Sequence, residues 1–303
     1  MNMAEPRSFQ ELRGALRRDE PMARHVSWRA GGTADRYFEP RDVEDLQVFL
    51  RATPKSEPIL FVGLGSNLLV RDGGFRGAVV SLHSARLHAE LMEGRVHAPA
   101  GVAAPKVARF AARHHLAGAE FLAGIPGTMG GALAMNAGCY GGETWDLVEA
   151  VTTIDRDGVV RRRPKADYEL GYRHCRLRGG GEEWFVAAEL VMPAGDGERA
   201  GARIKELLAK RVASQPLSLP NAGSVFRNPP GDHAARLIEA CGLKGLARGG
   251  ARVSEKHANF IVNPDGSAKA SDIETLILEV QRKVQDTTGV RLVPEVRIVG
   301  EAA

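Results

Sequence analysis

Residues 59–70 read ILFVGLGSNLLV, a glycine-rich turn between two short apolar runs. The first run predicts a buried strand over 59–62, and glycines in the turn at 63–67 would let backbone N–H groups approach a phosphate closely. A Rossmann nucleotide-binding fold would need glycine at position 68 and a helix after it, but Leu68 continues an apolar strand. A P-loop is excluded because no Gly-Lys-Ser/Thr sequence follows. Alone, this turn fits a structural role as well as a cofactor-binding one.

A second glycine-rich segment covers residues 124–131 and continues to Asn136 and Gly138. Glycines at this density cost conformational entropy on folding, and the close approach of a large planar or phosphorylated cofactor would explain them. Residues 121–142 carry no charge, but seven glycines and Pro126 make the stretch poor material for a membrane-spanning helix. Two glycine-rich loops, neither of the Rossmann kind, favour a dinucleotide held in a different fold.

Periodicity and turn residues predict helices and strands along the whole chain. Asp42 and Asp232 are expected helix N-caps, Asp157-Gly158 is the expected turn of a hairpin, and Ser271 with Glu274 forms an expected capping box. The expected strands cover 59–62, 68–70, 77–82, 95–98, the hairpin at 148–164, 184–192, 259–263 and 290–299. The expected helices cover about 43–50, 103–116, 198–213, 232–242 and 271–289.

A break in composition at residues 193–198 (PAGDGE) predicts a domain boundary. The chain of 303 residues is long enough for two domains of ordinary size. We therefore expect one domain over 20–195 and a second, α+β domain over 196–303.

Composition excludes several classes of function. The net charge is only +4, aromatic residues make up 6% of the chain, and no basic cluster is interleaved with aromatics, which argues against nucleic-acid binding. Three widely spaced cysteines and no histidine motif predict neither disulfides nor a metal site, as is typical of a reducing compartment. The first ten residues, MNMAEPRSFQ, lack an apolar signal-peptide region, so we expect a cytoplasmic protein without membrane association.

Four residues in the second half of the chain are candidates for chemistry. Arg173 can clamp a carboxylate, and Glu295 lies in an apolar stretch where a carboxylate needs a partner or a raised pKa. Ser224 does not match the G-x-S-x-G nucleophile pattern, but a serine hydroxyl can give a proton to a carbanion. His257 can meet a phosphate or cap a loop. Taken singly, these residues are more often members of ion pairs or turns than catalytic groups.

The order of these motifs resembles that of the UDP-N-acetylenolpyruvoylglucosamine reductase family, flavoenzymes of cell-wall precursor synthesis. The resemblance runs from about residue 25 to 299, nearly the whole chain. It is carried by 63–67, 124–131, Asn136, Gly138, Tyr140, Gly141, Tyr172-Arg173, 222–226, 254–259 and Pro294-Glu295-Val296. Each motif is weak alone, whereas five in this order are highly specific.

The resemblance implies an α+β fold with an FAD-binding region of the vanillyl-alcohol-oxidase (PCMH) type in two subdomains and a C-terminal α+β substrate-binding domain. It implies that NADPH reduces FAD, which then passes hydride from N5 to C3 of the enolpyruvyl group of UDP-N-acetylglucosamine enolpyruvate. The product would be UDP-N-acetylmuramate. Arg173 would polarise the substrate carboxylate, Ser224 would give the proton to C2, and Glu295 would act as an acid or orient its neighbours.

The same resemblance implies the remaining site residues, with FAD lying against backbone amides of 63–67 and 127–131. Cofactor-binding roles fall on Gly63, Leu64, Gly65, Ser66, Asn67, Gly127, Thr128, Gly130, Gly131, Asn136 and Gly138, and substrate-binding roles fall on Tyr140, Tyr172, Asn228 and His257.

Two residues depart from the family pattern, which usually has serine at the position of Cys175 and alanine at that of Cys139. Cys175 would make the site sensitive to oxidation. The short spacing between Arg173 and Ser224 resembles the shorter subclass, which lacks a loop with a substrate-covering tyrosine.

Two other functions remain open at this point. A flavin oxidase of the same fold is disfavoured because no histidine lies in either glycine loop to tether the flavin. A nucleotide-sugar-binding protein without chemistry would not need the proton donor Ser224. We expect a monomer that binds a UDP-sugar and NADPH, because no coiled-coil pattern or long exposed apolar strand is evident.

Overall fold

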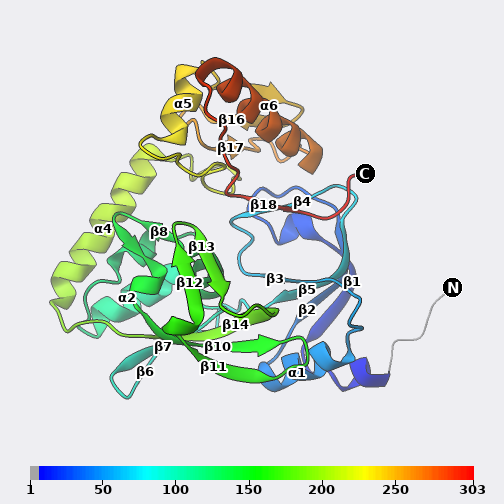
Figure 1. The fold of residues 1–303 in the computed structure, drawn as a ribbon, viewed down its shortest axis with the longest axis vertical. Coiled ribbons are helices and arrows are strands. Elements are labelled where there is room, and N and C mark those ends of the chain that lie inside the picture. Colours follow the sequence, from blue (N-terminus) through cyan, green and yellow to red (C-terminus); the bar gives the residue numbers. More distant parts are fainter. Residues whose placement is uncertain (1–6) are drawn as a thin grey trace. The chain divides into compact units, whose positions relative to one another are not determined.

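Residues 7–303 are described in a computed structural model and form two compact units (Figure 1). Within these residues, the first unit comprises 7–18, 36–63 and 77–209, and the second comprises 19–35, 64–76 and 210–303. Each unit is thus assembled from segments far apart in the sequence. The assignment of a cofactor role to 20–195 and a substrate role to 196–303 stays a prediction.

The first unit contains a five-stranded antiparallel sheet in the order β11-β10-β14-β7-β6. Its strands are β6 (Glu90–Met92), β7 (Arg95–Pro99), β10 (Val148–Asp155), β11 (Val160–Pro164) and β14 (Glu183–Leu190). Helices α2 (Ala104–Arg113) and α3 (Met129–Met135) share one hydrophobic core with β7, β10 and β14. Fully buried residues such as Val107, Leu133 and Trp145 fill this core.

A second sheet has the order β1-β2-β5-β3 and contains the strand that leads into the glycine turn. Its strands are β1 (Ala15–Pro21), β2 (Thr33–Glu39), β3 (Ile59–Val62) and β5 (Phe75–Ser81), and β3 pairs parallel with β5. Helix α1 (Val43–Ala52) begins at Asp42, whose side chain accepts a hydrogen bond from the N–H of Asp45 at 2.9 Å. The predicted N-cap and the predicted strand over 59–62 are both confirmed.

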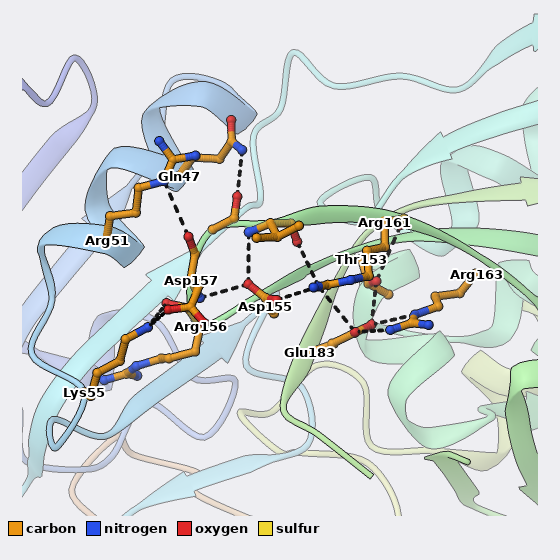
Figure 2. A network of polar contacts seen from close by, with 12 residues as sticks. Gln47, Arg51, Lys55, Thr153, Asp155, Arg156, Asp157, Arg161, Arg163 and Glu183 are labelled. Carbon is orange, nitrogen blue, oxygen red and sulfur yellow. Dashed lines mark hydrogen bonds and ion pairs between the residues drawn. The ribbon is translucent and has the colours of Figure 1, made fainter. Parts of the chain in front are cut away.

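The turn of the β10–β11 hairpin is tied to α1 by the polar network in Figure 2. Gln47 donates its side-chain amide to the carbonyl of Gly158 at 2.7 Å, and Lys55 pairs with Asp157. Gly158 has a φ of +72°, as a tight hairpin turn requires. The hairpin predicted at Asp157-Gly158 is therefore confirmed, and its turn is anchored to the helix.

The same network continues to β14 through Glu183 (Figure 2), which accepts hydrogen bonds from Arg163 at 2.5 Å and from Thr153 at 2.7 Å. The hydrogen bond from Arg163 holds the pKa of Glu183 below its ordinary value. The run Arg161-Arg162-Arg163 is thus neutralised by carboxylates on the strand surface.

The second unit has its own core, built around two helices and several short strands. These are β4 (Leu68–Val70) parallel to β18 (Arg297–Val299), the sheet β15 (Ala247–Arg248), β16 (Ala251–Val253) and β17 (Ile261–Val262), and helices α5 (Ala234–Ala240) and α6 (Ala270–Thr288). Trp28 is fully buried in this core and donates its indole N–H to the carbonyl of Ile261 at 2.7 Å. An N-terminal residue therefore completes a core made mostly of C-terminal residues.

The remaining elements are short, apart from one long helix. They are α4 (Gly197–Ser214), the strand pairs β8 (Gly138–Cys139) with β9 (Gly142–Glu143) and β12 (Tyr168–Gly171) with β13 (His174–Leu177), and five 3₁₀ turns at Arg7–Glu11, Met22–Arg24, Glu120–Gly124, Thr144–Asp146 and Lys165–Asp167. The uncharged stretch 121–142 folds into a 3₁₀ turn, α3 and β8. None of the helices within residues 7–303 is long and apolar enough to cross a membrane.

Three sequence predictions in the second unit were wrong in detail. Asp232 is not the cap of α5, because the carboxamide oxygen of Asn228 accepts the first free N–H, that of Ala234, at 3.1 Å. The strand predicted over 290–299 forms only at its end, since Pro294 lacks an N–H and the chain before Arg297 bonds elsewhere.

The capping box predicted from Ser271 and Glu274 is also absent from α6. Asp72 instead accepts hydrogen bonds from the backbone N–H groups of Ala270 and Ser271, both at 2.9 Å. Glu274 forms a bidentate ion pair with Arg71. The start of α6 is therefore capped by Asp72, which is distant in the sequence, and by Asp272, which accepts from the N–H of Lys269 at 2.9 Å.

Candidate active site

The glycine turn after β3 lies directly on residues His25 and Val26. Gly65 has a φ of +60°, and a Cβ atom there would lie 2.1 Å from the carbonyl oxygen of His25 and 2.6 Å from the Cα of Val26. Both contacts are with backbone, which no side-chain rotation can relieve. Glycine is therefore required at position 65 by conformation and by space.

Ser27 fixes the orientation of two peptide groups in this turn. Its N–H donates to the carbonyl of Gly65 at 3.0 Å, and its hydroxyl donates to the carbonyl of Leu64 at 3.4 Å. In a trans peptide the C=O and the following N–H point in opposite directions. The N–H groups of Gly65 and Ser66 therefore point away from Ser27, and within residues 7–303 neither has an acceptor.

The second glycine segment meets the first at Gly63, where a Cβ atom would lie 2.3 Å from the hydroxyl oxygen of Thr128. Backbone hydrogen bonds from Met129 to Val102 and from Gly130 to Ala100, both 2.8 Å, hold this segment in place. In the part of the chain that the structure describes, no acceptor is found for the backbone N–H of Thr128. Each of the two glycine-rich segments thus offers orphaned backbone donors of the kind that bind phosphate.

Asn136 ends α3 in the left-handed conformation, with a φ of +42°. Its buried amide donates to Glu143 at 2.8 Å and to the carbonyl of Gly171 at 3.1 Å, and its oxygen accepts from the N–H of Trp145. These contacts tie the end of α3 to the β12–β13 hairpin. They assign Asn136 a positioning role, while its predicted contact with the cofactor stays a prediction.

Arg173 lies in the two-residue turn of this hairpin, with a φ of +53°. One terminal nitrogen of its guanidinium donates to the carbonyl of Gly138 at 2.8 Å, and the group lies 5.0 Å from the ring centroid of Tyr172. The structure thus brings together Arg173, Tyr172, Gly138 and Asn136 in the first unit. Tyr140, also predicted to bind substrate, is 43% exposed and donates its hydroxyl to the carbonyl of Leu207.

Ser224 and Glu295 are brought together in the second unit. The N–H of Glu295 donates to the carbonyl of Val225 at 2.7 Å, and the N–H of Val225 donates to the carbonyl of Asn259 at 2.9 Å. The hydroxyl of Ser224 is half-buried and has no hydrogen-bond partner within residues 7–303. A serine held this way has a proton to offer a ligand.

Two residues predicted to contact the substrate also form structural hydrogen bonds within the protein. Asn228 caps α5, as described above. His257 accepts a hydrogen bond at Nδ1 from the N–H of Asn259 and packs edge-on against Phe260. Burial lowers the pKa of His257, so the ring is neutral near pH 7 and would offer a hydrogen bond rather than a charge.

The two cysteines that depart from the family pattern are structural. Burial raises the pKa of Cys175 to about 12, which opposes formation of the reactive thiolate. The thiol of Cys139 donates to the carbonyl of Phe121 at 3.1 Å. The expected oxidation sensitivity of Cys175 is therefore not supported. Among the described residues no cluster of histidine, cysteine and carboxylate side chains is placed to hold a metal ion.

Sequence profiles match two parts of the chain. A profile described as an FAD binding domain matches residues 34–163, and one described as the C-terminal domain of UDP-N-acetylenolpyruvoylglucosamine reductase matches residues 215–299. Together with the glycine-rich segments and their backbone donors, these matches define an FAD-dependent oxidoreductase of α+β fold. The predicted enzyme class and fold class are confirmed.

Curated relatives place the chain more narrowly. It is 58% identical over 290 residues to the UDP-N-acetylenolpyruvoylglucosamine reductase of Alkalilimnicola ehrlichii, covering 95% of this chain and 96% of the relative. It is 55% identical over 315 residues to that of Nitrosospira multiformis, covering 96% and 90%. The crystal structure of the Thermus caldophilus reductase superposes with a TM-score of 0.79 at 33% identity, covering 95% and 99%. The chain belongs to the UDP-N-acetylenolpyruvoylglucosamine reductase family.

Sequence reasoning missed Ser27, which bonds to the glycine turn on the side opposite the open donors, and Trp28, which is buried in the core of the second unit. No local pattern marks them, because their partners, Gly65 and Ile261, are distant in the sequence. The one available signal for Trp28 is that a large apolar side chain stands between polar and charged residues, which favours its burial in a core.

Proposed function

We propose that this protein reduces UDP-N-acetylglucosamine enolpyruvate to UDP-N-acetylmuramate with FAD as cofactor and NADPH as reductant. Membership of the family supports this reaction. The observation that carries the chemistry is the joint placement of Ser224 and Glu295. The hydroxyl of Ser224 has no partner among the described residues, and the N–H of Glu295 is bonded to the carbonyl of Val225, the residue after Ser224.

FAD would accept hydride from the reductant and donate it to the substrate. The backbone N–H groups of Gly65, Ser66 and Thr128 would hold it. The glycines around them exclude side chains that would block close approach. The other predicted cofactor contacts, from Leu64 to Gly138, are part of the same proposal.

Arg173 would polarise the substrate. Hydride addition at C3 of an enolpyruvyl ether builds negative charge at C2 that spreads into the carboxylate, so a fixed cation at that carboxylate stabilises the transition state. The carbonyl of Gly138 and the ring of Tyr172 hold the guanidinium in one orientation before substrate arrives. This preorganisation is what electrostatic catalysis needs.

Ser224 would complete the reaction by transferring its hydroxyl proton to C2. Glu295 would act as an acid beside the substrate carboxylate or orient its neighbours. Asn228, His257, Tyr140 and Tyr172 would bind the rest of the UDP-sugar.

The reductant, assembly and compartment follow from the resemblance and the composition. We propose NADPH, a monomer and the cytoplasm, without nucleic-acid or membrane partners.

An anaerobic absorbance experiment tests the proposal. The flavin-loaded protein should bleach with NADPH and regain its colour when UDP-N-acetylglucosamine enolpyruvate is added. Recovery with oxygen but not with the sugar would indicate a flavin oxidase instead. A protein that stays colourless after incubation with FAD would refute the assignment.

Substitution of Ser224 tests the chemical step. Ser224→Ala should leave bleaching by NADPH fast and slow the recovery by about 10²–10⁴-fold, the usual contribution of a positioned proton donor. Ser214→Ala is the matched control, because it removes a serine hydroxyl that donates only to the carbonyl of Lys210 in α4. Equal losses in both half-reactions would argue against the role of Ser224.

A further inference from the structure

Asn67, the last residue of the glycine turn, is bonded to the segment that carries Glu295. Its side-chain amide donates to the carbonyl of Glu295 at 3.1 Å, and its own carbonyl accepts from the N–H of Arg297 at 3.1 Å. The parallel pairing of β4 with β18 begins one residue later, at Leu68 and Arg297. The turn and the C-terminal segment are therefore joined before the regular strand pairing starts.

The other side of Glu295 is bonded to the segment that carries Ser224. The N–H of Glu295 donates to the carbonyl of Val225 at 2.7 Å, and Val225 follows Ser224 directly. Glu295 thus bridges the two segments through its main chain, receiving Asn67 at its carbonyl and holding Val225 with its N–H. Two hydrogen bonds connect the glycine turn to the residue beside Ser224, all within the second unit.

Glu295 lies outside the named strands, next to an isolated antiparallel bridge between Phe226 and Pro294. Pro294 precedes it and has no N–H, and β18 starts only at Arg297. The positions of Glu295 and Ser224 therefore depend on side-chain and irregular backbone bonds. Those bonds that reach the turn include the side-chain bond from Asn67 to Glu295 and the backbone bond from Arg297 to Asn67.

We propose that Asn67 is a positioning residue for the reaction at the substrate, in addition to its predicted place beside the cofactor. By holding the carbonyl of Glu295, it couples the conformation of the glycine turn to Glu295 and, through Val225, to Ser224. Binding of FAD at the turn then orders the residues that act in the second half-reaction. The roles of Glu295 and Ser224 in this inference rest on the proposed function.

Amide hydrogen exchange tests the coupling without measuring activity. In the wild-type protein, saturating FAD should slow exchange about tenfold or more at the turn, at 295–297 and at 225–227. In Asn67→Ala, FAD at a saturating concentration should slow exchange at the turn and leave 225–227 and 295–297 nearly unchanged.

Gln281→Ala is the matched control. The side-chain amide of Gln281 donates to the carbonyl of Leu292 at 2.6 Å, so this variant also releases an amide-to-carbonyl bond onto the C-terminal segment, but one that does not reach the glycine turn. FAD should still protect 225–227 and 295–297 in Gln281→Ala. Equal loss of protection in both variants would mean that Asn67 has only a general structural role, and this would overturn the proposal.

The half-reactions give a second readout. In FAD-loaded Asn67→Ala, reoxidation of the reduced flavin by the enolpyruvyl sugar should slow about tenfold more than reduction by NADPH. Similar slowing of both steps would contradict a positioning role.

The outcomes separate this inference from the function on which it rests. If FAD binds and protects the turn of the wild-type protein but not 225–227 or 295–297, the coupling is refuted and the reductase function stands. If FAD does not bind at all, the proposed function fails. The experiment on the wild-type protein needs no variant, so it tests the inference even if Asn67→Ala misfolds. Asn67→Ser provides a milder substitution.

Discussion

Replacement of Gly65 by alanine should damage both the stability of the protein and its affinity for FAD. Two penalties add at this position. A left-handed conformation costs an L-residue about 1–2 kcal/mol. The new methyl group would also lie 2.1 Å from the carbonyl oxygen of His25, and forced overpacking of this kind costs about 1–3 kcal/mol. We therefore expect the free energy of unfolding to fall by about 2–5 kcal/mol.

The effect on FAD follows from the way the clash would be relieved. The turn would have to move away from residues 25 and 26, which would break the bonds from Ser27 and reorient the N–H groups of Gly65 and Ser66. Hydrogen bonds to a charged group contribute about 1.5–3 kcal/mol each, so losing both would weaken FAD binding by about 100-fold or more.

Gly266→Ala is the matched control for the conformational penalty. Gly266 also has a positive φ, +71°, but a Cβ atom there would meet nothing within 4 Å. This variant should lose only about 1–2 kcal/mol of stability and should bind FAD normally. Urea unfolding of the apoproteins and titration of flavin fluorescence would measure the two quantities. Wild-type FAD affinity in Gly65→Ala, or equal effects of the two variants, would refute the argument that the turn is fixed by its contact with the backbone below it.

Three further predictions follow from the contacts described. Ser27→Ala should weaken FAD binding about 3- to 10-fold by freeing one peptide of the turn, whereas Ser27→Thr, which keeps the hydroxyl, should bind normally; titration with FAD would show whether the hydroxyl matters at all. Because Arg163 lowers the pKa of Glu183, their pairing should stabilise the fold fully above about pH 4.5 and less as the pH falls through the lowered pKa. Glu183→Gln should therefore make the free energy of unfolding, measured with urea, fall less steeply at acid pH. An unchanged pH dependence would exclude this pair as a source of acid sensitivity. With a pKa near 12, against an ordinary value of 9.0, Cys175 should carry about a thousandfold less thiolate in the native protein than in the urea-unfolded one. Equal alkylation rates in the two states, measured by mass spectrometry, would contradict this.

The sequence was sufficient to predict features that depend on neighbouring residues. The cap at Asp42, the hairpin turn at Asp157-Gly158 and the strand over 59–62 all rest on local chemistry, and all three are confirmed. The end of α6 at Gly289 belongs with them, since a left-handed residue after a helix favours glycine.

Features that depend on distant partners were predicted incorrectly or missed. Ser271 and Glu274 have the right spacing for a capping box, but Asp72 and Arg71 bind these positions from about 200 residues earlier. Local spacing cannot reveal these distant partners, although a local contact also forms one position away, where Asp272 accepts from the N–H of Lys269.

The candidate site shows the same limit. The glycine segments, Arg173, Ser224 and Glu295 were identified because they carry recognisable motifs. The left-handed turn that presents Arg173, and the bonds that join Ser224 to Glu295, arise from tertiary structure and leave no mark in the order of residues. The sequence therefore yields a prediction of which side chains act, and the structure adds the contacts that hold them.

The burial of Trp28 in a core of C-terminal residues has a consequence for the order of events during synthesis. Trp28 leaves the ribosome 233 residues before Ile261, the residue that accepts its indole N–H. Until then its ring, and the apolar side chain of Leu69 in the same core, have no native partners to cover them. The second unit can therefore complete its folding only when the last third of the chain has emerged. Until then the N-terminal residues of this core leave apolar surface exposed, which favours aggregation of the incomplete chain.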